Sequence, residues 1–489
     1  MLFNTIDFVI FFIVVLTTIT IIKNRKFQHL FILFASLFFF YYTSNYLIVL
    51  LVYTTIWDFY LGGAIWKSRS IKRKKILLIL SLSGNLGLLG FFKYADFAIT
   101  QFNILGNYFD LAAHIPLLYL ALPIGISFYT FHSVGYIIDV YRGNVTPSKS
   151  LMEYMIFVSF FPQLVAGPIL RAGQFLPQLR ENLEQSVGIR LRQIIIENQN
   201  LKLGITMMAL GFFKKMVISD NLTRMVDEIF LIPIGLESFT IILGTIAFGI
   251  KIYCDFSGYS DIAIGAALIM GFKIPANFNK PYFATSPSDF WRRWHISLSS
   301  WLRDYLYIPL GGNRKSHIRL YLNLFITMFL GGLWHGASWN FVIWGMLHGS
   351  YLALHKIILT KFPILQNNSF FKSKIGIVIS IFITQYFIFL TWIAFRVQNV
   401  EYLIYCMEKY IMLDFQTSNT IQYILLHPVP VAVMMSFIIL HFISYMKGNL
   451  IEKISNYKSL YWIMFLTGIM LVIFFSFDGT PEQFIYFKF

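Results

Sequence analysis

The sequence predicts an all-α, polytopic integral membrane protein, and three features of the chain lead to that fold class. Of its 489 residues, 57% are hydrophobic and only 13% are charged, whereas an ordinary soluble domain carries about 25% charged residues. The mean hydropathy is +0.66. Apolar runs of nearly spanning length recur from one end of the chain to the other. Together these features exclude a string of soluble domains.

The apolar runs define the expected helices in chain order. A helix that spans a bilayer needs about 20 apolar residues. Several runs are shorter, so we expect some helices to be tilted, re-entrant or buried among neighbours, and we predict about eleven or twelve spanning helices in all. The runs cover residues 6–22, 28–42, 46–66, 76–95, 117–140, 151–170, 203–219, 238–254, 258–272, 318–334, 338–357, 374–396, 430–447 and 459–476.

Positive charge gathers in short loops between these runs. Three cations lie within 23–27 and six within 67–75, whereas 96–115 carries two aspartates but neither Lys nor Arg. Cytoplasmic loops of membrane proteins are enriched in Lys and Arg. We therefore expect the first two loops in the cytoplasm, and 96–115 and the N-terminus outside. The net charge of +16 lies in such loops, which argues against a nucleic-acid partner.

Other features narrow the class of protein further. Residues 1–22 have no cation before their apolar run and no cleavage site after it, so we expect a first membrane helix rather than a signal peptide. The two cysteines, Cys254 and Cys406, provide neither a metal-binding spacing nor a disulfide framework, so no metal is expected.

Three segments between or after the runs have a different character. The polar stretch 171–202 is expected to form amphipathic, interfacial helices on the cytoplasmic face. Two prolines flank a glutamine turn in 160–168, which indicates a broken or re-entrant helix. The aromatic end of the chain, 484–489, is expected to lie at the membrane interface.

A polar island follows residue 286. Ser286 and Pro287 form a credible helix start, and we predict one helix over 287–307, ended by Pro309 and two glycines. At about 100° per residue, one face of this helix collects the polar residues. This face would lie at the interface, or it would line a polar cavity inside the protein. Its members are Asp289, Arg292, His295, Ser299 and Arg303.

Three acidic residues suggest ion pairs within this region. Asp289 precedes Arg293 at the favourable i,i+4 spacing. Asp255 and Asp261 interrupt apolar runs and are candidates to pair with Arg292, Arg293 or Arg303. We interpret all three acids as structural partners that hold the cavity rather than as direct catalysts.

A second histidine, His335, lies at the end of the 318–334 run with glycines on both sides. An ionisable group in so apolar a segment is costly and is a functional-site hypothesis by default. The alternative is a histidine that bonds a backbone carbonyl between packed helices. His348 would point elsewhere on the helix, and we interpret it as structural or as lying at an interface. We interpret His317 as solvated, and no constellation supports His114, His132, His355, His427 or His441.

The segments Ser286–Arg314 and Phe329–Asn340 resemble the two signature blocks of the membrane-bound O-acyltransferases. The similarity is greatest to the bacterial alginate O-acetyltransferase branch of that family. It extends to Leu122–Phe131, Phe160–Arg171, Tyr253–Gly265 and the aromatic C-terminus, and so covers most of the chain from about residue 90 onward.

The resemblance implies a single membrane domain of this family's fold with a thin, funnel-like centre, in the bacterial cytoplasmic membrane. Its core would be 91–357, flanked by peripheral helices 1–90 and C-terminal helices 358–489. The catalytic histidine would be His335, and His295 would be the second motif histidine. No tightly bound cofactor is implied. The donor would be acetyl-CoA or another thioester, delivered from the cytoplasm, and the acceptor would be a hydroxyl outside.

The chemistry fits these residues, because a thioester is already activated and lacks only a deprotonated hydroxyl. His335 would act as general base or as a transient acyl acceptor. His295 would hydrogen-bond the substrate or stabilise the oxyanion. Residues expected to line the cavity or bind the donor are Trp334, Trp339, Asn340, Arg292, Ser299, Arg303 and Asp304.

Relatives of this kind work with a separate extracytoplasmic acetyltransferase and a polysaccharide acceptor. The main alternative is transfer of a D-alanyl group from a carrier protein to teichoic acid, and acylation of a lipid or a protein is a third. Outside the enzymes, the competing class is a transporter. Transporters often show inverted repeats with paired broken helices, and we find no such repeat in the sequence.

Overall fold

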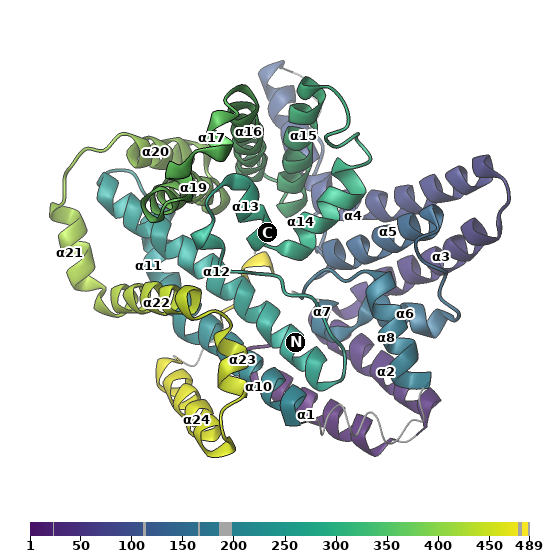
Figure 1. Ribbon diagram of the computed structural model, residues 1–489. Coiled ribbons are helices and arrows are strands. Elements are labelled where there is room, and N and C mark those ends of the chain that lie inside the picture. Colours follow the sequence, from purple (N-terminus) through teal and green to yellow (C-terminus); the bar gives the residue numbers. More distant parts are fainter. Residues whose placement is uncertain (23, 111–113, 165–166, 185–197, 478–481, 488–489) are drawn as a thin grey trace. The chain divides into compact units, whose positions relative to one another are not determined.

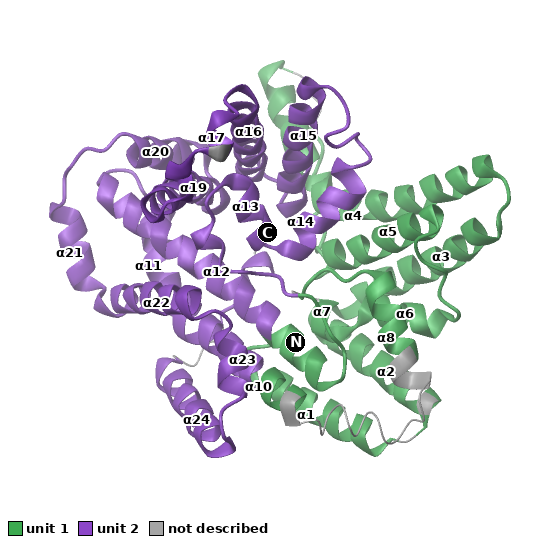
Figure 2. Ribbon diagram, in the orientation of Figure 1, with its two compact units in different colours: residues 1–205, 262–275 green, residues 206–261, 276–489 purple. Residues whose placement is uncertain are grey.

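Helices form nearly all of the computed structural model (Figure 1), which describes residues 1–22, 24–110, 114–164, 167–184, 198–477 and 482–487. No strand occurs within these ranges, so the all-α prediction is confirmed. The chain forms two compact units, 1–205 with 262–275 and 206–261 with 276–489 (Figure 2). Two of the three boundaries fall inside α10 and α12, and the third lies between α12 and η3.

The first unit begins with the N-terminal helices. Side-chain caps start several of them, as where Thr5 Oγ1 accepts the Phe8 amide before α1. The extended segment before Ile126 shortens the run predicted at 117–140, because Pro123 and the left-handed Gly125 (φ 83°) delay the helix start. The helices are α1 (Ile6–Ile21), α2 (Arg25–Ser44), η1 (Asn45–Leu47), α3 (Ile48–Lys67), α4 (Ile71–Tyr108), α5 (Ile126–Arg142), α6 (Leu151–Ser159), α7 (Phe161–Leu164), α8 (Ala172–Glu184) and the start of α10 (Asn198–Phe212).

The break predicted in 160–168 is confirmed, since α6 ends at Ser159 and the one-turn α7 follows. Of the polar stretch 171–202, residues 172–184 and 198–202 are helical. Residues 185–197 lie outside the described part of the chain.

The second unit contains both signature blocks. Its helices are η2 (Phe213–Ser219, π-helical), α11 (Asp220–Leu231), α12 (Ser238–Ile269, shared with the first unit), η3 (Pro281–Phe283), α13 (Pro287–Arg293), α14 (Ile296–Leu302), η4 (Arg303–Tyr307, π-helical), α15 (His317–His335), α16 (Trp339–Lys361), α17 (Ile364–Asn367), α18 (Ser369–Lys372), α19 (Lys374–Arg396), α20 (Val400–Ile411), α21 (Ser418–Leu426), α22 (Pro428–Lys447), α23 (Leu450–Ser455), α24 (Ser459–Ser476) and η5 (Ile485–Phe487).

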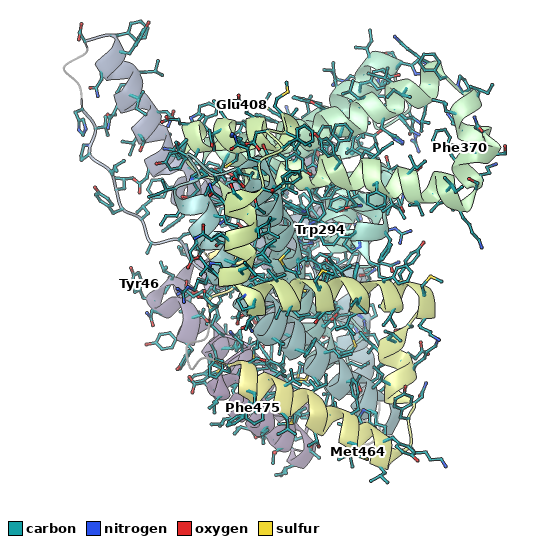
Figure 3. All side chains as sticks on the ribbon, turned by 90° about the vertical axis from the view of Figure 1, so that its left-hand side faces the viewer. Tyr46, Trp294, Phe370, Glu408, Met464 and Phe475 are labelled. Carbon is teal, nitrogen blue, oxygen red and sulfur yellow. The ribbon has the colours of Figure 1, made fainter. Side chains whose placement is uncertain are left out.

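Spanning helices are abundant in both units. Within the described residues, seven helical segments are long and apolar enough to cross a membrane. One of them, Lys26–Lys67, contains both α2 and α3, which η1 separates. Apolar side chains remain exposed on these helices: Met464 and Phe475 on α24 are 62% and 81% accessible (Figure 3). Lipid tails can cover such surfaces, so the fold is that of a multi-pass membrane protein.

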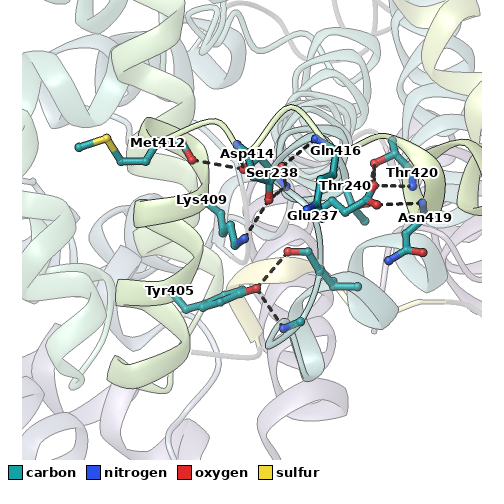
Figure 4. A network of polar contacts seen from close by, with 12 residues as sticks. Glu237, Ser238, Thr240, Tyr405, Lys409, Met412, Asp414, Gln416, Asn419 and Thr420 are labelled. Atoms are coloured by element: carbon teal, nitrogen blue, oxygen red, sulfur yellow. Dashed lines mark hydrogen bonds and ion pairs between the residues drawn. The ribbon is translucent and has the colours of Figure 1, made fainter.

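A polar network fixes loops at the start of α12 (Figure 4). The Glu237 carboxylate accepts the amides of Asn419 and Thr420, at 3.1 Å each, and so caps α21. Asp414 accepts the Ser238 amide and the Lys409 ammonium. These bonds tie α12 to the α20–α21 connection within the second unit.

Helices α15 and α16 approach so closely that glycine is required at their contact. A Cβ at Gly345 would lie 2.7 Å from the Met328 carbonyl oxygen, and one at Gly332 would lie 2.4 Å from the Phe341 carbonyl oxygen. Distances this short force backbone to move. The contact holds the end of α15, and with it His335, in place.

Gly345→Ala is expected to destabilise the protein by about 1–3 kcal/mol, because the added methyl group overpacks this contact. Gly331→Ala is the matched control, since its Cβ would lie at an ordinary 3.4 Å from Leu302 Cδ1, and alanine favours a helix. Thermal unfolding in detergent measures both. An unfolding temperature for Gly345→Ala at or above that of Gly331→Ala would contradict the close packing.

Candidate functional site: two buried histidines in an aromatic cluster

The polar island is two short helices rather than the single helix predicted over 287–307. His295 adopts a left-handed conformation (φ 42°) between α13 and α14. Two backbone groups beside His295 pair with residues 277–279 instead of within a continuous helix. The Asn279 amide donates to the Arg293 carbonyl at 2.8 Å, and the Ile296 amide donates to the Asn277 carbonyl at 2.9 Å. The predicted polar face is therefore wrong, because the break turns the later residues away from it.

His295 is fully buried, and its hydrogen bonds determine its tautomer. Its Nδ1 lies 3.1 Å from Asn277 Oδ1. That oxygen also receives the Ser297 amide at 3.3 Å and the Ser297 hydroxyl at 2.9 Å. The backbone N–H can only donate, so the side-chain oxygen of Asn277, not its nitrogen, must face this side. Consequently Nδ1 carries the proton in the neutral ring, and Nε2 carries the lone pair.

The lone-pair nitrogen of His295 has no hydrogen-bond partner among the described residues. Burial lowers the pKa of His295, which lies outside the seven spanning segments, to about 3. The ring is therefore neutral at physiological pH. Its faces and edges meet aromatic rings, with the Phe256 centroid at 4.6 Å and the Trp334 centroid at 6.4 Å. A buried, unprotonated nitrogen without a protein donor is suited to accept a hydrogen bond from a substrate.

His335 lies in the same aromatic cluster. It is 5% accessible at the end of α15, and the Trp334 ring contacts both histidines, at 4.8 Å from His335. Further walls come from Trp344 at 4.7 Å and Phe395 at 5.2 Å, each edge-on to the imidazole. The structure thus brings together the two histidines that the sequence singled out.

Residues 484–486 also enter this cluster, which corrects the expectation of an interfacial position for this part of 484–489; residues 488–489 lie outside the described part of the chain. The Tyr486 ring is 5.5 Å from the His335 ring and 4.8 Å from Phe256. Burial raises the pKa of the Tyr486 phenol, so it stays protonated at neutral pH. The sequence signal was present, because aromatic and apolar residues alternate with almost no charge over 484–487, but nothing local indicates what they pack against.

The two acids in α12 pair with lysines, not with the arginines proposed from the sequence. Lys215 Nζ is 2.8 Å from Asp255 Oδ1, and Lys214 Nζ is 2.6 Å from Asp261 Oδ2. The prediction that these acids form ion pairs is confirmed, and the Asp255 pair is buried, whereas the Asp261 pair is partly exposed. The choice of partner was wrong. Two adjacent lysines inside the apolar run 203–219 were the signal that could have identified it.

The other residues that the sequence assigned to the polar face or the cavity do not gather at one location. The Asp289–Arg293 pair is confirmed at 2.9 Å. Arg303 is 62% exposed and pairs with Asp304 at 2.7 Å, and Arg292 and Trp339 are exposed as well. Ser299 donates to the Trp294 carbonyl at 3.1 Å.

Asn340 alone among these residues is fully buried with neither amide atom hydrogen-bonded within the described chain. Leaving a buried amide unpaired costs about 1–3 kcal/mol. Such a group therefore suggests a ligand that satisfies it.

His348 is structural, as predicted. Trp291 Nε1 donates to its Nδ1 at 3.3 Å, and its Nε2 lies 3.0 Å from the Thr391 hydroxyl. His317 is exposed, also as predicted. Over the residues that can be described, no three His, Cys, Asp or Glu side chains gather as a metal site would require.

The fold and the site define a polytopic membrane protein with two histidines in one buried aromatic cluster. Comparison with known proteins supplies the chemistry. Residues 144–404 match the family model of MBOAT, the membrane-bound O-acyltransferase family. The chain belongs to this family and is an acyltransferase, which sets aside the transporter alternative.

Individual relatives agree with this assignment. The chain is 36% identical over 403 residues to a peptidoglycan O-acetyltransferase of Helicobacter pylori, covering 78% of this chain and 73% of that protein. It is 37% identical over 408 residues to the probable alginate O-acetylase AlgI of Pseudomonas aeruginosa, covering 82% and 73%. A teichoic acid D-alanyltransferase of Streptococcus thermophilus is 30% identical over 257 residues, covering 49% and 58%.

Proposed function

We propose that the protein transfers an acetyl group from a cytoplasmic thioester, acetyl-CoA in the first instance, to a hydroxyl on the outer side of the membrane. The acceptor would be an extracellular or periplasmic polysaccharide, reached directly or through an extracytoplasmic acetyltransferase. The N-terminus would lie outside. The observation that carries the proposal is the meeting of two buried histidines, one with a lone pair available, in one cluster.

Acetyl transfer is favoured over D-alanyl transfer by the relatives. Those named as O-acetyltransferases match 78% and 82% of this chain, whereas the D-alanyltransferase matches 49%. The family's other acceptors, lipids and proteins, have no corresponding support among the relatives described above.

The proposed reaction needs one proton to move twice. His335 takes the proton from the acceptor hydroxyl as its oxygen attacks the thioester carbonyl carbon. The tetrahedral intermediate collapses, the carbon–sulfur bond breaks, and the departing thiolate receives the proton back from His335. The alternative is that His335 itself attacks the carbonyl, the carbon–sulfur bond breaks and the thiolate leaves. The transient acyl-imidazole then passes the acyl group to the hydroxyl, and the hydroxyl proton balances the charge of the departed thiolate.

His295 is assigned to hold the acceptor. A group whose pKa is about 3 is a weak general base at neutral pH, but its Nε2 can accept a hydrogen bond from a neighbouring hydroxyl of the acceptor, while the proton of the attacking O–H goes to His335. The same tautomer argues against an oxyanion role, because the neutral ring has no proton on Nε2 to donate. The unpaired amide of Asn340 is the better candidate donor for the carbonyl oxygen.

Purified protein in proteoliposomes tests the proposal. With acetyl-CoA and an oligosaccharide acceptor, we expect release of free CoA and acetylated product. We expect kcat/KM for acetyl-CoA to exceed that for a D-alanyl carrier protein by about tenfold or more, since a mismatched donor loses at least one good contact. A higher kcat/KM with the D-alanyl carrier would replace acetyl by D-alanyl transfer, and no thioester cleavage with either donor would refute both.

A further inference from the structure

A buried ionic triad lies next to the histidine cluster and is not explained by the reaction. Lys215 Nζ contacts Asp255 Oδ1 at 2.8 Å and Asp220 Oδ1 at 2.7 Å. The side chains of Lys215 and Asp255 are only 1% and 2% exposed. A buried ion pair gains little net stability over apolar packing, because desolvation of the charges offsets their attraction. The presence of the triad at this buried position therefore needs an explanation other than stability.

Local structure brings this lysine against α12. The π-helical η2 inserts an extra residue per turn where Lys214 and Lys215 lie. A Cβ at Gly258 of α12 would lie 2.7 Å from the Gly211 carbonyl oxygen, so the two helices pack closely here. The triad is thus built into a tight helix contact.

The triad also holds main chain from the far end of the sequence. Asp255 Oδ2 accepts the Ile485 amide at 2.7 Å, and Lys215 Nζ lies 3.5 Å from the Gln483 carbonyl oxygen. One acidic and one basic side chain therefore bind an N–H and a C=O two residues apart. We call the held segment, residues 483–487, the C-terminal strap.

The strap forms part of the wall around the histidines. Phe484 packs on Tyr259, with ring centroids 4.5 Å apart. Tyr486 contacts His335 at 5.5 Å and Phe256 at 4.8 Å, and Phe256 in turn contacts His295 at 4.6 Å. Releasing the strap would remove a wall from His335 and the support behind Phe256, which packs on His295, and would admit water.

We infer that Asp255 and Lys215 are positioning residues, which fasten the C-terminal strap and so hold Tyr486 against His335. The inference rests on the proposed function only for its effect on turnover. The attachment itself is a property of the folded chain. Such an anchor also explains why charge is retained at this buried point, since a carboxylate accepts an amide more strongly than a neutral group does.

The chain provides a matched control on the same helix. Asp261 pairs with Lys214 at 2.6 Å, so it forms the same kind of bond with the adjacent lysine. No hydrogen bond from Asp261 to the strap occurs within the described residues. Asp261→Asn therefore breaks an ion pair without touching the strap, whereas Asp255→Asn removes the charge and leaves a single oxygen to serve both Lys215 and the Ile485 amide.

Strap attachment is measured with a cysteine at Phe487, because the native Cys254 and Cys406 are buried. In detergent, Asp255→Asn is expected to raise the maleimide labelling rate of Phe487→Cys by about tenfold or more, since the closed segment opens more often. In the otherwise native protein, it is expected to lower kcat for acetyl-CoA by about tenfold, the effect of one charge-assisted bond. KM should stay within about twofold. Asp261→Asn should change none of these values.

A second variant covers the case in which Asp255→Asn fails to fold. Ile485→Pro removes the amide hydrogen that Asp255 accepts and fixes the local φ, at the first position of η5 where proline fits a helix start. It leaves the side chains of the triad intact, and Ile485→Ala keeps the amide hydrogen. We expect faster labelling and lower kcat for the proline variant relative to the alanine variant. Equal labelling in the two would overturn the anchor. Faster labelling with unchanged kcat would overturn its role in turnover. Labelling does not depend on acyl transfer, so failure of the proposed function would be seen separately.

Discussion

Replacing His335 with alanine is expected to lower acyl transfer by about 10²–10⁴-fold, the range for a lost general base, while the protein still folds and inserts. The variant loses the group that removes the hydroxyl proton, but the aromatic rings around it remain. Turnover of acetyl-CoA in proteoliposomes measures the loss. Transfer at the native rate by a folded variant would remove His335 from the chemistry.

His348→Gln is the matched control for that experiment. His348 is equally buried, and Trp344 contacts both histidines, at 4.7 Å from His335 and 4.5 Å from His348. Its two nitrogens are occupied by Trp291 and Thr391, so we expect lower thermal stability but kcat within about twofold of the native value. A similar loss of kcat in both variants would indicate that packing, not proton transfer, is measured.

The two roles left open for His335 have different signatures. If it is transiently acylated, rapid acid quenching without an acceptor should leave one acetyl group on His335, detectable by peptide mass spectrometry. If it is the general base, no acetyl group should be found there, and thioester cleavage should require the acceptor hydroxyl. Each result supports one mechanism and excludes the other.

Local sequence patterns, namely apolar runs and helical spacing, predicted most of the helices well. The apolar runs of α1, α2, α3, α16, α19, α22 and α24 correspond closely to observed helices, because lipid-facing helices must be apolar along their whole length. The Asp289–Arg293 pair followed from helical spacing alone. The boundary between two other runs was misplaced: Asp255 was taken to separate two spans, yet α12 is continuous, since Lys215 compensates the charge.

The break at His295 and the position of the C-terminal strap depend on contacts between distant parts of the chain. Asn277 and Asn279 open the helix at His295 by taking its backbone bonds, and the triad binds residues near 485 to residue 255. Local propensity contains no information about such partners. His335 and His295 could be singled out from the sequence, whereas the tautomer of His295 and the strap required coordinates.

That tautomer leads to the second large effect, which a pair of substitutions at His295 can isolate. The nitrogen of an asparagine side chain can occupy the position of Nδ1 and still donate to Asn277, while nothing replaces Nε2. Glutamine, being longer, can place its oxygen near Nε2 and accept a hydrogen bond there. We expect His295→Asn to lower kcat/KM by about 10–100-fold, the cost of one hydrogen bond that holds the acceptor in the reacting position, and His295→Gln to recover part of that loss.

A purely structural role for His295 leads to the opposite order. Its only hydrogen bonds within the described chain run from Nδ1, to Asn277 and Ser297, so asparagine would then be the better replacement in both stability and turnover. Measuring kcat/KM and thermal unfolding for the two variants separates the cases. If the glutamine variant is the more active and the asparagine variant the more stable, then Nδ1 of His295 holds the loop and Nε2 binds the substrate.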